Sequence, residues 1–223
     1  MKNASWIAII CILTLNACSK RKSDNMLPED YGCIKRCYLP VTAHAVSSSD
    51  VNTINELFSA NQIANGNLRY YGYILDSLQT RYPPYKKYEM QVATVDQYAN
   101  GVRIFLRSMS YIFLDHKFSS ESGEITKGTT LDTAHQLTLP QLRGLFLASL
   151  QHDPIAAKYK DSCLKAEFGY YNLNTGISFT PEILVKAWRV TPLNSVYPSE
   201  YPEAYYEDNG KLIFYTNGIQ TYK

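Results

Sequence analysis

The sequence lacks the motifs on which most enzyme classes depend. Its four histidines, His44, His116, His135 and His152, are far apart, and none belongs to the His-Glu-x-x-His pair that places two zinc ligands on one helix face. A Gly-x-Ser-x-Gly nucleophile elbow, a phosphate-binding glycine-rich loop and a dinucleotide fingerprint are also missing. We therefore predict no catalytic residue, no metal site and no cofactor, and we interpret the chain as a non-enzyme.

An excess of either charge is lacking as well. The chain carries 22 Lys and Arg against 20 Asp and Glu, so we expect no nucleic-acid partner. Acid–histidine neighbours occur at Asp115-His116 and His152-Asp153, and each is a candidate half of an acid–base pair. Such neighbours are more often polar residues at the ends of strands and helices, and Cys163, a candidate nucleophile, opens a predicted strand. We assign catalysis to none of them.

The chain begins with a short apolar run. Lys2 precedes it, and it extends from Trp6 to Leu15, too short to span a bilayer as a mature helix and too early to be a core element. This pattern predicts a secretory signal peptide over residues 1–17, in preference to a buried helix that happens to contain a cysteine.

The end of the apolar run, Leu15-Asn16-Ala17-Cys18, resembles the lipobox of bacterial lipoproteins. The resemblance implies cleavage before Cys18, acylation of this cysteine and, because Ser19 follows it, sorting to the outer membrane. Residues 19–30 are polar and charged, as flexible tethers are, and we assign residues 18–45 to a lipidated tether. We therefore expect a cell-envelope protein that contacts the membrane through its N-terminal lipid.

The remaining cysteines are odd in number. Of five, Cys11 leaves with the signal peptide and Cys18 takes the lipid, so Cys33, Cys37 and Cys163 remain in an oxidising compartment. We expect one disulfide that involves Cys33 or Cys37, with its partner open, and one free thiol. Cys33-x-x-x-Cys37 is also read as a small closed loop or as two metal ligands, although no second Cys/His pair with zinc spacing follows it.

About 190 residues remain after the signal peptide and the polar linker, enough for one ordinary domain or two small ones. In the first block, residues 46–128, Ser49 or Asp50 is predicted to cap a helix that ends near Asn65-Gly66. Strands are expected at residues 67–78, 88–98 and 102–115, with Asn100-Gly101 as the turn of a long hairpin. The expected apolar stripe of the helix is Val51, Ile54, Leu57 and Phe58, and one face of the last strand is expected to hold Val102, Ile104 and Leu106.

The second block, residues 129–223, repeats this order. Thr138-Leu139-Pro140-Gln141 has the spacing of a capping box, which predicts a helix to about His152. Its apolar stripe is Leu139, Leu142, Leu145, Phe146 and Leu150. Strands are expected at residues 164–170, 183–191, 203–207 and 211–216, the last two joined by Asp208-Asn209-Gly210. Asn-Gly is typical of a type I′ hairpin turn, because both central residues take positive φ.

The two blocks predict an α+β fold made of two modules, each a helix packed on an antiparallel sheet. The phrase Asn-Gly-Val-Arg-Ile-Phe at residues 100–105 returns as Asn-Gly-Lys-Leu-Ile-Phe at residues 209–214, which fits one tight hairpin in each module. Coincidence is the alternative, because many hairpins use Asn-Gly before an aliphatic and an aromatic residue.

The second block resembles a known family. "LVKAWRVTP" (184–192) and "YPEAYYEDNGKLIFYTNGI" (201–219) are similar to the PepSY domain, a small cystatin-like module. "VATVDQYANGVRIF" (92–105) resembles the propeptide module that precedes PepSY in thermolysin-like and fungalysin metalloproteases. The tandem arrangement implies a protease propeptide without its protease, whose role in that family is to help a peptidase to fold and to inhibit it.

Tyrosine is the unusual component, with nineteen in the chain. One set in each block is a candidate wall of a groove for peptide or glycan: Tyr70, Tyr71 and Tyr73, and then Tyr197, Tyr201, Tyr205 and Tyr206. Packing within strands is the alternative, with about half of each set pointing outward. We expect Trp188 in the core, and the turn Glu207-Asp208-Asn209 to be solvated rather than to bind calcium.

These features predict a non-catalytic envelope lipoprotein that binds a protein partner. The propeptide resemblance implies that the partner is a peptidase that the chain inhibits or helps to fold, and an exposed sheet edge would receive a peptide by strand addition. Two other functions stay open. One is a surface protein that binds glycan or matrix or has a structural role, and the other is an unrecognised hydrolase.

Overall fold

The structure is a computed structural model that describes residues 30–126, 130–176, 180–193 and 201–218. Its elements in chain order are β1 (Ile34–Cys37), α1 (Ser48–Ala60), β2 (Leu68–Gln79), β3 (Lys87–Ala99), β4 (Val102–Leu114), β5 (Lys117–Gly123), α2 (Leu139–Leu150), α3 (Ala156–Tyr159), β6 (Leu164–Asn172), β7 (Leu184–Pro192), β8 (Glu203–Glu207) and β9 (Leu212–Thr216). None of the helices in these ranges combines the length and the hydropathy needed to cross a membrane.

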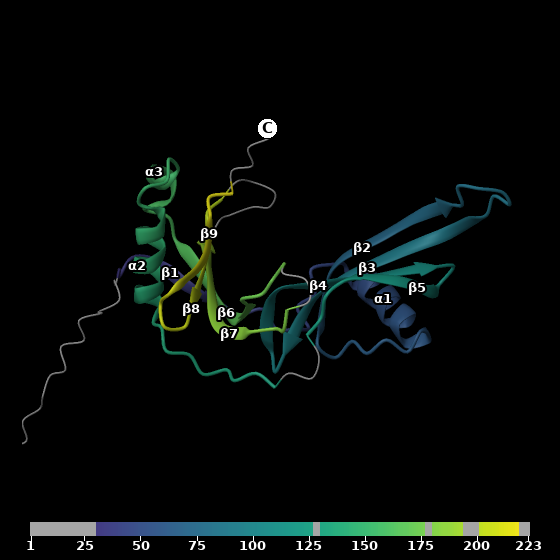
Figure 1. Ribbon diagram of the computed structural model, residues 1–223, viewed down its shortest axis with the longest axis horizontal. Coiled ribbons are helices and arrows are strands. Elements are labelled where there is room, and N and C mark those ends of the chain that lie inside the picture. The colour runs from purple at the N-terminus through teal and green to yellow at the C-terminus, as the bar shows by residue number, and fades with distance from the viewer. Residues whose placement is uncertain (1–29, 127–129, 177–179, 194–200, 219–223) are drawn as a thin grey trace, which may run out of the picture.

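The nine strands form one mixed sheet. Its main path is β2-β3-β4-β6-β7-β8-β9, while β1 pairs with β6 and β5 pairs with β4. Most neighbours are antiparallel, and within the described residues the parallel pairs are β1–β6 and β4–β6. The predicted α+β class is confirmed. The two separate sheets expected for two modules are not observed in this part of the chain, because β4 and β6 join them into one elongated body (Figure 1).

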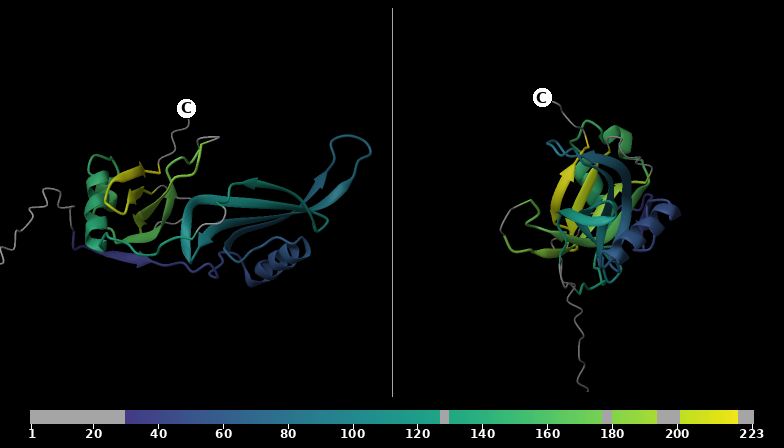
Figure 2. Two further views of the ribbon diagram at one scale, coloured as in Figure 1. Left: turned by 60° about the horizontal axis from the view of Figure 1, so that its bottom comes forward. Right: turned by 90° about the vertical axis from the view of Figure 1, so that its right-hand side faces the viewer.

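The first half of the sheet, β2 to β5, is covered on one side by α1. Ile54, Leu57 and Phe58 of α1 are buried, as the helical spacing predicts. The Phe58 ring meets those of Tyr70 and Tyr111 edge to face, with ring centroids 5.7 and 4.9 Å apart. Such contacts between aromatic rings add stabilisation beyond the buried area. Figure 2 shows α1 on one side of these strands and open space on the other.

Both ends of α1 lie before the predicted positions. The cap is Ser47, not Ser49 or Asp50, and its hydroxyl accepts a hydrogen bond from the backbone N–H of Asp50. The helix ends at Ala60 rather than near Asn65-Gly66, because Gln62 takes a left-handed conformation with φ 58°. The backbone N–H of Ile63 then returns to the carbonyl of Phe58 and closes the last turn.

The second half has the same construction. The capping box at Thr138 and Gln141 is present, and α2 begins at Leu139 as predicted. Leu142, Phe146 and Leu150 are buried against β6, β7 and β8. Trp188 is 1% exposed, which confirms it as a core residue.

The two halves are interlocked at the tip of the first hairpin. Ala99, Val102 and Ile104 come from the first hairpin, but they pack in the core beneath α2 and not in the core beneath α1. Val95 of the α1 core and Ala99 lie on the same side of β3, so both helices cover one side of the sheet. Gly169 permits the close parallel pairing of β4 with β6, because a Cβ there would lie 2.6 Å from the carbonyl oxygen of Arg103. We call the opposite, helix-free side the outer side.

A bulge in β4 reverses its facing. Leu106 has φ 58° and is 52% exposed, so it does not continue the predicted face of Val102 and Ile104. Beyond it, Arg107, Met109, Tyr111 and Phe113 point to the helix side instead. A positive φ at leucine is uncommon, which explains why the alternation in the sequence gave no sign of the reversal.

Two strands were not predicted. β5 follows β4 through the tight turn Asp115-His116, whose residues have φ 47° and 64°. β1 lies in the segment 18–45 that we assigned to the tether, and it pairs in parallel with β6. Folded structure therefore begins before residue 46.

The Cys33–Cys163 disulfide ties β1 to the start of β6 and closes a loop over a sequence separation of 130. Cys37 is the free thiol, so the expected single disulfide and odd cysteine are both present. Arg143 of α2 reinforces this corner, because it is buried and donates hydrogen bonds to Asp30 and to the carbonyls of Cys33, Ser162 and Lys160. A structural disulfide is typical of an extracytoplasmic protein.

The two Asn-Gly phrases make different turns. Asn100 and Gly101 have φ 51° and 75°, as a type I′ hairpin requires. At the second turn only Gly210, with φ 93°, is left-handed, and its N–H donates to the carbonyl of Glu207. The type I′ prediction is therefore right for the first hairpin and wrong for the second, which uses a longer turn with a bulge at Gly210.

Candidate functional site

The β2–β3 hairpin ends in a projection away from the rest of the molecule (Figure 1), and residues 90–94 at its base pair with β4. We call this segment, residues 71–94, the arm. β2 is the last strand of the sheet. The edge of β2 away from β3 is occupied at Tyr70, where the backbone of Ala45 donates to the carbonyl and His44 Nδ1 accepts from the N–H. Farther along β2, the Ser77 N–H donates to the side chain of Asp76. From Gly72 to Gln79, β2 pairs with β3 alone among the described residues, so its other edge is free.

The outer side of the first half carries an apolar patch. The strand registers bring together, row by row, Ile74 with Val92 and Ile112, Met90 with Leu114, and Leu78 with Tyr88. Ile74 is 56% and Leu78 is 43% exposed, and the others are half-buried. We call these residues, namely Ile74, Leu78, Tyr88, Met90, Val92, Ile112 and Leu114, the outer patch. Asp76, the register partner of Met90, lies on the same side and interrupts the patch. A sheet with one face on solvent normally alternates apolar and polar residues, so a patch with this many apolar neighbours indicates a contact surface.

The polarity changes in steps toward the base of the arm. Next to the outer patch, the hydroxyls of Thr94 and Ser110 lie 3.4 Å apart. Beyond them, charged side chains of alternating sign cross neighbouring strands. We call this row the charge ladder; its members are Arg69, Asp96, Arg103, Glu167, Arg189 and Glu203.

The charge ladder is largely withdrawn from water. Arg103 lies 2.8 Å from Asp96 and 3.6 Å from Glu167, while Arg189 contacts Glu203 at 3.0 Å. Burial alone would lower the pKa of Arg189, but the hydrogen bonds to Glu203 and the charges of Glu203 and Glu167 together outweigh burial and raise it. All members are paired, so the ladder supports the sheet and offers no free charge for chemistry.

The tip of the arm is basic and aromatic. Arg81, Lys86 and Lys87 lie there with no acidic residue between Asp76 and Glu89. Tyr82 is 71% and Tyr85 is 65% exposed. These side chains extend the exposed surface of the arm beyond the outer patch.

The predicted tyrosine groove is not assembled. Tyr70 is buried in the α1 core, Tyr206 in the α2 core, and Tyr205 beside Phe105 on the outer side. Tyr73 and Tyr201 are half-buried, and of the predicted set in the described residues only Tyr71, at 43%, is exposed. Packing therefore explains most of these tyrosines. Tyr197 lies outside the described residues, as does Cys18 with the predicted signal peptide.

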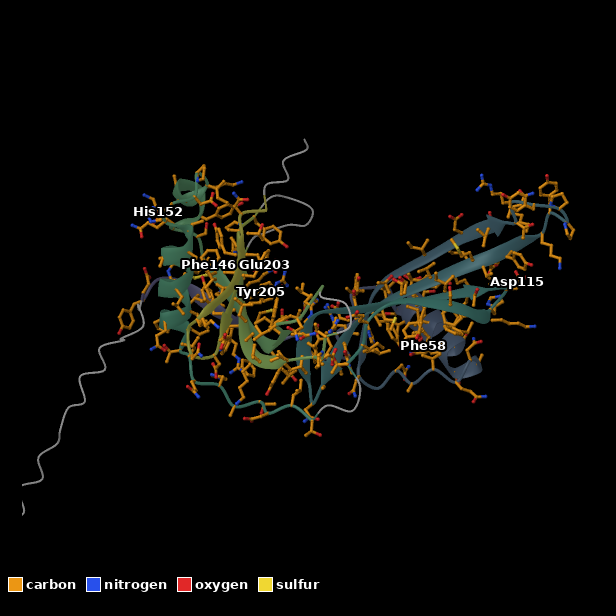
Figure 3. The ribbon with its side chains drawn as sticks, viewed as in Figure 1. Phe58, Asp115, Phe146, His152, Glu203 and Tyr205 are labelled. Carbon is orange, nitrogen blue, oxygen red and sulfur yellow. A yellow bond between two sulfur atoms is a disulfide. The ribbon has the colours of Figure 1, made fainter. Side chains whose placement is uncertain are left out.

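The other predicted polar sites are separate from one another. Figure 3 places Asp115 at the far end of the first half and His152 beside α2, so the two acid–histidine neighbours are at opposite ends of the molecule. His116 lies 3.5 Å from exposed Glu89, and Asp153 accepts a hydrogen bond from Tyr215. No cluster of three potential metal-binding side chains occurs within the described ranges.

Asp208 differs from the solvated turn residue that we expected. It is 6% exposed and accepts hydrogen bonds from Trp188 Nε1 and from the backbone of Gln136 and Leu137. The carboxylate thus fixes the segment that enters α2 against the last hairpin, which is a structural role.

Sequence reasoning missed the outer patch, although a signal was present. In residues 88–98, Met90 and Val92 alternate with Ala93 and Val95, so both faces of the strand contain apolar residues. The buried set is Ala93 and Val95, whereas the set of Met90 and Val92 lies on the outer side. An antiparallel strand that is apolar on both faces needs two partners.

Comparison of the chain with protein-family models and with curated protein sequences found no match.

Proposed function

We propose that this chain is a non-catalytic lipoprotein of the bacterial cell envelope that binds a protein partner with its arm. The single observation that carries the proposal is the coincidence of a free β2 edge, from Gly72 to Gln79, with the outer patch beside it. An extended segment of the partner would add a strand to β2 and place alternate apolar side chains against the outer patch. Strand addition supplies main-chain hydrogen bonds, and the patch supplies selectivity for apolar side chains.

We assign the partner to the peptidases, following the resemblance of the two halves to tandem propeptide modules. On this assignment residues 46–128 correspond to the first propeptide module and residues 129–223 to the PepSY-like, cystatin-like module. The order in each half supports it, because a capped helix is followed by antiparallel strands. The chain would then inhibit the peptidase or help it to fold, by contact rather than by chemistry.

The test uses a secreted thermolysin-like metallopeptidase of the same organism. Addition of the purified chain should slow hydrolysis of a peptide substrate, or should raise the yield when the denatured peptidase refolds. Val92→Glu places a charge in the middle of the outer patch and should abolish the effect. Asn52→Glu, at an exposed position on α1, is the matched control and should behave like the wild type.

Hydrogen exchange gives an independent measurement of the same complex. Backbone amides between Gly72 and Gln79 on the free edge should become protected when the peptidase is bound. The proposal is wrong if the chain neither slows peptide hydrolysis nor raises the refolding yield of the peptidase. It is also wrong if Val92→Glu has the same effect on the peptidase as Asn52→Glu.

One observation favours a second function, the binding of an anionic glycan or matrix polymer. The tip of the arm carries Arg81, Lys86 and Lys87 beside exposed Tyr82 and Tyr85. Retention on an array of acidic polysaccharides, lost in a variant with Ser at the three basic positions, would support this function. It would leave the outer patch without a role.

The lipid anchor at Cys18 is part of the proposal. In cells fed labelled palmitate, the wild-type chain should take up the label and sediment with the outer membrane. Cys18→Ser should lose the label and the membrane association together. Cys37→Ser is the control and should keep the label. If Cys37→Ser loses the label and Cys18→Ser keeps it, the proposed lipid anchor at Cys18 is wrong.

A further inference from the structure

A cavity opens on the helix side of the sheet, near the place where the two halves join. It has a volume of about 860 Å³, in the range of sites that hold small molecules or inserted side chains. Its walls come from the end of α1, the β4–β5 hairpin and the segments around Thr126 and Glu182. The outer patch lies across the sheet from it, so the two surfaces are independent.

The cavity is acidic. Glu121, Glu124 and Glu182 line it, and Arg107 is the one basic residue among the described lining residues. Arg107 is 5% exposed and donates to both Glu124 and Glu182, the latter at 2.7 Å. Its charge is therefore already balanced. An anionic ligand would find no free cation in this lining and would be repelled by the carboxylates.

Tyr111 and Glu121 are the groups left available for recognition. They are direct cross-strand partners in the β4–β5 hairpin, and both line the cavity. Tyr111 is 5% exposed, yet its hydroxyl has no hydrogen-bond partner in the described part of the chain. Glu121 makes no ion pair there either. The hydroxyl oxygen is not among the fully buried side-chain atoms without a partner in the described residues, so a ligand that donates a hydrogen bond to it would replace water at the wall of the cavity.

The state of Tyr111 agrees with a role as acceptor. Burial and the neighbouring charge of Glu121 raise the pKa of Tyr111, so the hydroxyl stays neutral and can accept a hydrogen bond while it donates its own proton to another group. Ile63, Met109 and Phe118 complete the wall with apolar surface. The cavity thus combines one free carboxylate, one neutral hydroxyl and an apolar wall.

We infer that this cavity binds an alkyl ammonium or guanidinium group, with the cation against Glu121, an N–H donated to the Tyr111 hydroxyl and the hydrocarbon body against Phe118. The same chemistry is carried by a free diamine-type molecule and by a basic side chain of a peptide. The inference does not depend on the proposed peptidase partner.

The experiment titrates the full-length chain, purified in detergent, with two probes at low ionic strength by calorimetry. Agmatine, which carries one guanidinium and one ammonium group, is the free cation, and a blocked Ala-Ala-Lys-Ala-Ala peptide carries a single ammonium group on a side chain. Saturable binding of one equivalent is expected for at least one of them. Agmatine alone would identify a small-molecule ligand, and the tighter binding of the peptide would identify an inserted side chain.

Two variants test the assigned contacts. Glu121→Gln keeps the shape but removes the charge, and should weaken binding at least about tenfold. Tyr111→Phe keeps the packing against Phe58 and should weaken it by about fivefold. Glu56→Gln, at an exposed position on α1, should leave the affinity unchanged.

Three results would overturn the inference. They are the absence of saturable binding by either probe to the wild-type chain, equal affinity of the wild type and Glu121→Gln, and tighter binding of the dianion succinate than of agmatine. The wild-type titrations decide the matter even where a variant fails to fold. Val92→Glu should bind the probes normally, which separates this site from the arm.

Discussion

The two halves of the sheet are alike on the helix side and different on the outer side. Each has one helix over a core of aromatic and aliphatic side chains. On the outer side, the second half is closed by the charge ladder and by a small cluster around Phe105, Ala187 and Tyr205. The first half instead leaves Ile74, Val92 and their neighbours exposed or half-buried.

This difference indicates that one half of the sheet mainly stabilises the fold, whereas the other half mainly provides a contact surface. The second half also holds the disulfide and buried Arg143, so several kinds of interaction fix its shape. Residues 90–94 of the arm pair with β4, whereas residues 72–79 pair with β3 alone among the described strands. Regions with few neighbours contribute least to the free energy of unfolding. We conclude that the second half is the scaffold and that the arm is the surface that it presents.

The largest expected effect contrasts a core ring with an outer-patch residue. Phe146 is 0% exposed beneath the second half, and Phe146→Ala should lower the free energy of unfolding by about 3–5 kcal/mol. Ile74→Ser, in the outer patch, should change it by less than about 0.5 kcal/mol, because most of this side chain is already in water. Urea denaturation followed by tyrosine fluorescence measures both. Equal losses would mean that the outer patch is part of the core.

The disulfide gives the next effect. Cys163→Ser should lower the free energy of unfolding by about 2–5 kcal/mol, because the bond closes a long loop in the unfolded chain. Cys37→Ser removes the free thiol and should have a much smaller effect. Thermal unfolding with and without reductant measures the difference. If the wild type and Cys163→Ser unfold at the same temperature under oxidising conditions, the proposed division between scaffold and arm is weakened.

Much of the fold could be predicted because local signals agreed with the final structure. The capping box at Thr138 indicated the start of α2, the period of two residues in residues 164–170 located β6, and the turn Asp208-Asn209-Gly210 located β8. Asn100-Gly101 located the turn of the long hairpin. In each case the residues that form the element also determine it.

The parts that could not be predicted depend on residues distant in the sequence. β1 is a strand because it pairs with β6. This pairing places Cys33 next to Cys163, so the disulfide forms between these two residues and not between Cys33 and Cys37. The close pairing of β4 with β6 depends on the missing Cβ of Gly169, which no local pattern reveals. One continuous sheet replaced the two expected sheets for this reason.

The candidate site shows the same limit. The sequence left two interpretations of the tyrosines open, a groove wall or packing within strands, and Tyr70, Tyr205 and Tyr206 are buried by packing. The exposed apolar residues were instead Ile74 and Leu78, which alternation alone assigns to either side. Only the strand registers show which side has a helix and which has none.

The charge ladder should have an intermediate effect. Glu167 lies 3.6 Å from Arg103 and 3.8 Å from Arg189, so Glu167→Gln leaves two buried guanidinium groups with one partner fewer. We expect a loss of about 1–3 kcal/mol in the free energy of unfolding. Lys211→Met breaks the exposed pair with Glu207 and should change it by less than about 0.5 kcal/mol. If Glu167→Gln leaves the free energy of unfolding unchanged, the charge ladder does not hold the two halves together.

The smallest expected effect is the pH dependence that Glu203 contributes. Burial alone would raise the pKa of Glu203, but hydrogen bonds and charge from Arg189 outweigh burial and lower it below its ordinary value. The folded state therefore favours the ionised form, and this stabilisation is complete above the ordinary glutamate pKa and is lost as the pH falls through the lowered one. Between about pH 6 and pH 3, the wild type should lose more stability than Glu203→Gln, while Glu56→Gln should follow the wild type. Parallel curves for the wild type and Glu203→Gln would mean that solvent, rather than Arg189, sets the charge at this end of the ladder.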